Sequence, residues 1–131
     1  MHIKEEHFQI HSEIWEDTLN VIFTEDIDLS IRTQCEIQGF DHKPYMSEGK
    51  VIDGCVLTVE EPNYRSIWFL LKIGCVESTV VHELEHFVFR LLDSKGICHN
   101  YHTTEVFAYT FAFYYKEIMK IYAKFKPKNK K

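Results

Sequence analysis

The stretch that decides the fold is residues 78–94, STVVHELEHFVFRLLDS. Its apolar residues recur with the period of an α-helix and share one broad face, made of Val80, Val81, Leu84, Phe87, Val88, Leu91 and Leu92. Two residues of the opposite face, His82 and His86, are four positions apart and therefore lie on the same side of the helix. The stretch predicts a helix that buries one face and presents two histidines on the other.

The polar face contains the pattern His-Glu-x-x-His at residues 82–86. Two imidazoles with this spacing can bind one metal ion, and Glu83 is close enough to polarise a water on that metal. A catalytic zinc site uses three protein ligands and keeps one position open for water. We therefore expect His82 and His86 to be zinc ligands and Glu83 to act as a general base in hydrolysis.

Glu105 is the expected third ligand. It follows His86 after eighteen intervening residues and lies in the first turn of a second predicted helix, residues 103–122. A carboxylate in that turn also suits the helix dipole. The small side chains of Ala108 and Ala112 share the face of Glu105 and would allow the two helices to approach closely.

Three other polar residues are candidates for the same site. His99 and His102 fall in the predicted loop between the two helices and could bind the metal in place of Glu105. Either histidine, or the phenol of Tyr109, could instead stabilise the oxyanion that forms during hydrolysis. We expect His102 or Tyr109 to have this catalytic role, although Tyr109 also has many aromatic neighbours with which it could pack.

With the segment Glu105-Val106-Phe107-Ala108-Tyr109, the chain resembles the gluzincin clan of zinc peptidases. Similar members are the ImmA/IrrE-type peptidase domains and the short metallopeptidases of tailed phages. The resemblance covers roughly residues 50–122 and implies a Zn2+ cofactor, a protein or peptide substrate, and the roles given above for His82, His86, Glu105 and Glu83. Tyr109 departs from the thermolysin-like pattern, which places there an Asp that orients a ligand histidine.

Two other functions remain open on the sequence. The chain could be a non-catalytic, zinc-stabilised interaction protein, such as a phage-encoded binder of a host protein or a part of a virion. The presence of Glu83 argues against this function, because a purely structural metal site does not need a general base. Hydrolysis of an amide other than a peptide is the third possibility.

The length of 131 residues and the apolar fraction of 45% predict one ordered domain. We expect a single α+β domain over residues 1–123, a minimal zincin-like fold with a small mixed sheet, a metal helix and a Glu-bearing helix. Strands are expected at 7–15, 19–23, 51–60 and 66–73, and helices at 29–38, 78–94 and 103–122. The strand at 66–73 is expected to border the active-site cleft.

The charges and the ends of the chain bear on partners and location. Residues 120–131 carry six lysines and no acidic residue. The rest of the chain, the acidic body, is therefore more negative than the net charge of −5 indicates. That body argues against nucleic-acid binding as the main activity, and residues 124–131 are expected to be a basic disordered tail. The N-terminus has no signal-peptide character and no apolar run is long enough to span a membrane, so a cytoplasmic location is expected. For a phage protein this would be the host cytoplasm.

Overall fold

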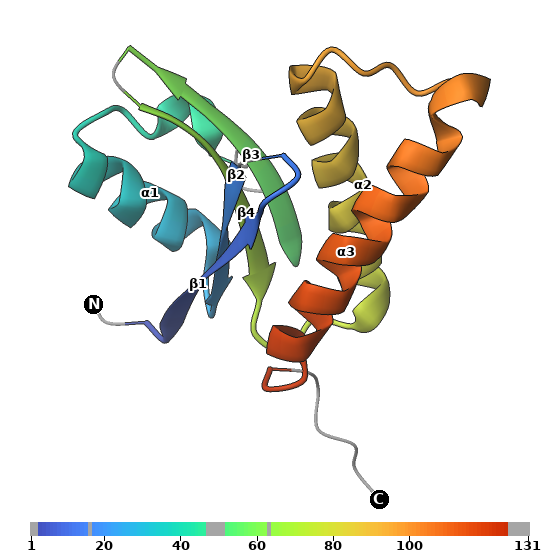
Figure 1. Ribbon diagram of the computed structural model, residues 1–131. Helices are drawn as coiled ribbons and strands as arrows, with labels where there is room; N and C mark the ends of the chain where they lie inside the picture. The colour runs from blue at the N-terminus through green and yellow to red at the C-terminus, as the bar shows by residue number, and fades with distance from the viewer. Residues whose placement is uncertain (1–2, 16, 47–51, 63, 126–131) are drawn as a thin grey trace, which may run out of the picture.

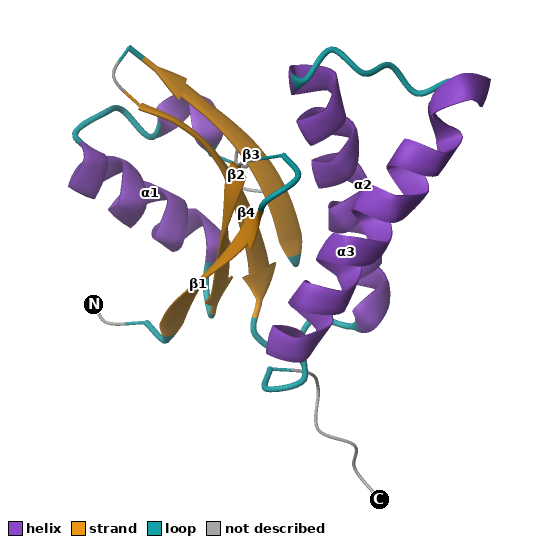
Figure 2. Cartoon of the chain, in the orientation of Figure 1, coloured by secondary structure: helices purple, strands orange, loops and turns teal. Residues whose placement is uncertain are grey.

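The computed structural model describes residues 3–15, 17–46, 52–62 and 64–125. The elements in chain order are β1 (Glu5–Ser12), β2 (Asp17–Thr24), α1 (Ile27–Gln38), β3 (Gly54–Glu61), β4 (Tyr64–Lys72), α2 (Glu77–Ser94) and α3 (Thr104–Tyr122), with 3-10 helices at Lys43–Tyr45 and Tyr101–Thr103. These four strands and three α-helices confirm the expected α+β class. Figure 2 shows the strands beside the helices.

The four strands form one mixed sheet in the order β1-β2-β4-β3. β1 and β2 are antiparallel, β3 and β4 are antiparallel, and the central pair β2 and β4 is parallel. The two hairpins therefore meet along a parallel seam. β4, the strand immediately before α2, lies inside the sheet, which corrects the expectation that it borders the cleft. β3 occupies the edge instead.

Helices cover both faces of the sheet (Figure 1). α1 lies on one face, whereas α2 and α3 lie together on the other. The apolar residues buried beneath α1 are Ile22, Ile27, Ile31, Cys35, Val59, Trp68 and Leu70. On the other face α2 contributes Val80, Leu84, Phe87, Val88, Leu91 and Leu92 to a larger core. These are residues of the predicted apolar face of α2, so its histidine-bearing side is left to face outward.

The ends of the helices differ slightly from expectation. Helix α1 begins at Ile27, two residues before the expected range of 29–38. Asp26 caps it, because its Oδ1 accepts a hydrogen bond from the backbone N–H of Leu29 at 3.1 Å. The helix ends at Gln38 as expected, because Gly39 takes the left-handed conformation with φ of 86°. Helix α2 begins at Glu77, one residue before the expected start at residue 78, and has no side-chain cap.

The described chain continues beyond α3 into the core. Phe125 is buried and stacks on Phe23, with ring centroids 4.5 Å apart. Its carbonyl oxygen also accepts a hydrogen bond from the N–H of Gly74 at 3.0 Å. Phe125 therefore belongs to the folded domain, which moves the predicted boundary from residue 123 to at least residue 125. The rest of the predicted tail, residues 126–131, lies outside the described residues.

None of the helices in the described ranges combines the length and the apolar character that crossing a membrane requires.

Candidate metal centre

Helix α2 places the His-Glu-x-x-His residues along the edge of the sheet. The His82 side chain is 66% exposed, whereas that of Glu83, the next residue round the helix, is only 12% exposed. This difference follows from the packing of α2 against β3, because Glu83 faces the strand and His82 faces solvent. The motif therefore combines an open histidine with a shielded carboxylate.

The rings of His82 and His86 approach each other through their Nε2 atoms. The Nε2 atoms of His82 and His86 are 3.2 Å apart, and the rings are nearly perpendicular, at 84°. Two nitrogens bound at about 2.0–2.1 Å to one tetrahedral zinc would be separated by about 3.3 Å. The spacing of this pair therefore fits two adjacent ligands of a tetrahedral metal ion.

Glu83 lies beside this pair at the wall of a cavity. Its Oε2 is 3.8 Å from the Nε2 of His82, too far for a direct hydrogen bond. Both side chains line a cavity of about 500 Å³ that also includes Asp53 and Thr79. Glu83 is thus placed to accept a proton from a water held between it and the histidines.

The close fit of Glu83 depends on Gly54, the first residue of β3. A Cβ at this position would lie 2.7 Å from Cγ of Glu83 and 3.0 Å from Cγ2 of Thr79. The described glycines outside β3 behave differently, since each has a positive φ and open space around its Cα. Gly54 is therefore required for the close approach of α2 to the strand, and not for an unusual backbone conformation.

We predict that Gly54→Ala displaces Glu83 while leaving both histidines in place. Overpacking of this kind costs about 1–3 kcal/mol, so thermal unfolding should show a lower midpoint. Zinc content, measured by elemental analysis, should stay at the wild-type level. The same substitution in a Glu83→Ala background should cost clearly less, since the clashing Cγ is then absent. An equal cost in both backgrounds would contradict the contact.

The free edge of β3 is tied to the same helix. Arg90, one turn after His86, donates a hydrogen bond from Nη1 to the backbone carbonyl of Val56. Because β3 is an edge strand, this carbonyl would otherwise be open to another chain. The guanidinium therefore occupies an outward-facing carbonyl of β3 two residues beyond Gly54.

Cys55, next to Gly54, has a partly buried thiol. Burial raises the pKa of this thiol to about 12, and the nearby Glu83 carboxylate acts in the same direction. In the protein without bound metal the thiol is therefore protonated at neutral pH.

The register between α2 and α3 separates Glu105 from the histidines. The ring of Phe107 contacts that of Phe89, with centroids 4.9 Å apart, and Tyr114 contacts Phe87 at 4.7 Å. The helices are thus antiparallel, and Glu105 lies level with the last turns of α2, beyond His86. Side chains lean toward the N-terminus of their own helix, so those of Glu105 and His86 lean apart.

Among the described residues, no three His, Cys, Asp or Glu side chains are placed to hold one metal ion. Glu105 as the third ligand therefore stays a prediction. Glu105, Ala108 and Ala112 are all exposed, so the face of α3 that carries Glu105 is turned to solvent and not packed against α2 as expected. The ring contacts of Phe107 and Tyr114 hold α3 in this orientation.

The predicted oxyanion-stabilising residues also lie elsewhere. Tyr109 is 74% exposed and lines a separate cavity with Trp15 and Phe113. His102 is exposed in the 3-10 helix after Asn100, whereas the ring of His99 packs on Phe107 with centroids 4.3 Å apart. The structure thus brings together His82, Glu83 and His86. Tyr109, His102 and His99 lie apart from this group.

Gly54, Thr79 and Asp53 were not anticipated from the sequence as parts of the site. A glycine inside a predicted strand, as Gly54 is in the predicted strand 51–60, is a recognised signal of close backbone approach and could have identified this residue. No comparable sequence signal marks Thr79 or Asp53, whose places depend on how β3 meets α2.

Comparison with protein-family models, with curated proteins and with solved structures finds no match for this chain.

Proposed function

We propose that this protein is a zinc-dependent hydrolase, and that its substrate is a peptide or protein. The observation that carries the proposal is the convergence of His82 and His86, with Nε2 atoms 3.2 Å apart, beside the shielded carboxylate of Glu83. A purely structural metal pair has no need of this carboxylate. The resemblance to gluzincins adds Glu105 as the proposed third ligand.

The chemistry of the proposed reaction divides between the cofactor and the chain. When bound at the histidine pair, zinc supplies Lewis-acid activation of a water and of the scissile carbonyl. Glu83 accepts the proton that the attacking water loses and then delivers it to the nitrogen of the leaving amine as the C–N bond breaks. The low exposure of Glu83 limits competition from bulk water at that carboxylate.

Glu83→Gln tests this division of roles. The amide keeps the shape of the side chain but cannot act as a base, so zinc content should be unchanged. Hydrolysis should fall by about 10²–10⁴-fold, the usual contribution of a general base. The assay should use the zinc-loaded protein and a mixture of unstructured polypeptides, with new amino termini counted as products. Glu85→Gln, an exposed neighbour on the same helix, is the matched control.

The outcomes of this assay separate the candidate functions. Zinc binding without hydrolysis in the wild type would favour a zinc-stabilised interaction protein. Equal hydrolysis by wild type and Glu83→Gln would contradict the assigned base. A parallel measurement on Glu105→Ala decides the third ligand, since retention of full zinc affinity would remove Glu105 from the site.

A further inference from the structure

The sheet contains a fork between its two hairpins. The β1–β2 ladder includes every residue of β2 from Asp17, and the β3–β4 ladder begins at Tyr64. The parallel ladder that joins the hairpins begins only at Asn20 and Trp68. Before that pair, β2 and β4 diverge toward their turns (Figure 1), and we call the space between these two arms the fork.

The strand pattern shows which backbone groups face the fork. Ile73 N–H donates to the carbonyl of Thr24, so the backbone N–H and C=O groups of even-numbered residues of β2 point toward β4. Lys72 N–H donates to the carbonyl of Asp53 on β3, so even-numbered residues of β4 direct their backbone groups toward β3. The backbone groups of odd-numbered residues of β4 therefore point toward β2. Thr18 on β2 and Arg65 on β4 therefore each direct a backbone N–H and C=O into the fork. Both residues are exposed and precede the joining ladder.

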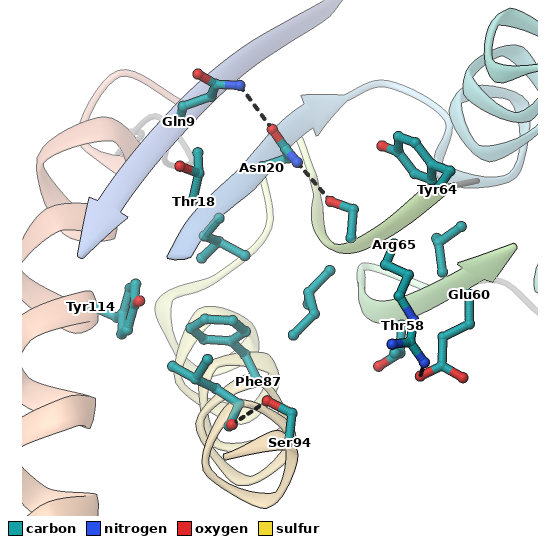
Figure 3. A pocket seen from close by; sticks show the side chains of 15 residues that line it. Gln9, Thr18, Asn20, Thr58, Glu60, Tyr64, Arg65, Phe87, Ser94 and Tyr114 are labelled. Carbon is teal, nitrogen blue, oxygen red and sulfur yellow. Dashed lines mark hydrogen bonds and ion pairs between the residues drawn. The ribbon is translucent and has the colours of Figure 1, made fainter. Parts of the chain in front are cut away.

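A cavity of about 790 Å³ occupies the fork (Figure 3). On one side lie three polar side chains in a hydrogen-bonded chain, in which Gln9 donates to Asn20 at 3.1 Å and Asn20 donates to Ser66 at 2.9 Å. On the other side lie Ile67 of β4 and Phe87 of α2. The cavity has the size of small-ligand sites, which is about 300–1,000 Å³.

We propose that the fork binds a short peptide segment in an extended conformation. The backbone groups of Thr18 and Arg65 supply donors and acceptors on both sides, as in strand addition to a sheet. Successive side chains of a strand point to opposite faces. The bound segment would therefore direct an apolar side chain toward Ile67 and Phe87 and a polar one toward Asn20. This site is separate from the histidine pair and does not rest on the proposed hydrolase function.

Amide NMR with two blocked tripeptides tests the proposal on the full chain. Acetyl-Ser-Leu-Ser-amide should shift the amide signals of Thr18 and Arg65 in a saturable manner. The same peptide with an N-methylated leucine keeps the apolar group but loses a backbone donor, and it should bind at least tenfold more weakly. Absence of these shifts would overturn the proposal. Equal binding of both peptides would do the same, because it would indicate an apolar ligand site that does not read backbone amides.

A proline pair gives an independent test. Thr18→Pro removes an N–H that faces the fork and leaves the β1–β2 ladder intact, so peptide affinity should fall at least tenfold. His7→Pro is the matched control, because the N–H of His7 points outward from the β1 edge, away from the fork. Equal affinity in both variants would contradict the role of Thr18. The two-peptide comparison uses the unmodified chain and decides the proposal even if Thr18→Pro does not fold.

Discussion

Replacing His82 or His86 by alanine should abolish stoichiometric zinc binding. The two Nε2 atoms have the spacing of adjacent zinc ligands, so removal of either ring leaves a single nitrogen at the site. The loss in zinc affinity should exceed about 100-fold, since even outer-shell partners of zinc ligands contribute 10–100-fold. Competition with a chromophoric chelator measures this affinity, and Glu85→Ala on the same helix is the control.

The same variants should also lose the effect of zinc on stability. A ligand that binds only the folded protein stabilises it by about 2.7 kcal/mol at a free concentration 100 times its Kd. Added zinc should therefore raise the melting temperature of wild type and Glu85→Ala, and should leave that of His82→Ala and His86→Ala unchanged. A rise of equal size in all four proteins would place the bound zinc elsewhere on the chain.

Phe125→Ala should destabilise the fold strongly, although this residue stands between two lysines near the end of the chain. Its ring is buried against Phe23, and truncation of a buried Phe typically costs about 3–5 kcal/mol. Urea unfolding at equilibrium measures the loss. Lys124→Ala, at the neighbouring exposed position, should cost at most about 1 kcal/mol, because its ammonium lies 5.6 Å from the centroid of the Phe8 ring.

Two truncations extend this test. Deletion of residues 126–131 should leave the unfolding midpoint close to that of the full chain, because Phe125 and its hydrogen bond to Gly74 remain. Deletion from residue 124 onward removes the ring and should reproduce the Phe125→Ala loss. If the two truncations unfold alike, the packing of Phe125 makes no contribution to stability.

The fold could be predicted where one residue pattern determined one local structure. The apolar face of α2 was expected from its helical period, and all of its residues except Val81 are buried. Gly39 ended α1 because its left-handed conformation suits glycine. Phe125 was missed because a single aromatic among lysines has no period, and only the surface formed by Phe23 and Phe8 shows why it is buried.

The candidate site was predictable within one helix and not between helices. Spacing along α2 alone brings His82 and His86 together, since residues four apart share a helix side. The place of Glu105 depends on the position and rotation of α3 against α2, which are decided by ring packing such as that of Phe107 on Phe89. A count of eighteen residues between His86 and Glu105 determines neither of them.

The parallel seam between the hairpins has a consequence for the order of folding. Each hairpin pairs residues that are close in sequence, so it can form early and at small entropic cost. The seam begins with the pair Asn20 and Trp68 and spans only five residue pairs. Its formation must close a long loop of the chain that contains α1 and the whole of β3. Closure of the seam is therefore expected to limit the folding rate, with the two hairpins exposing unpaired inner edges until then.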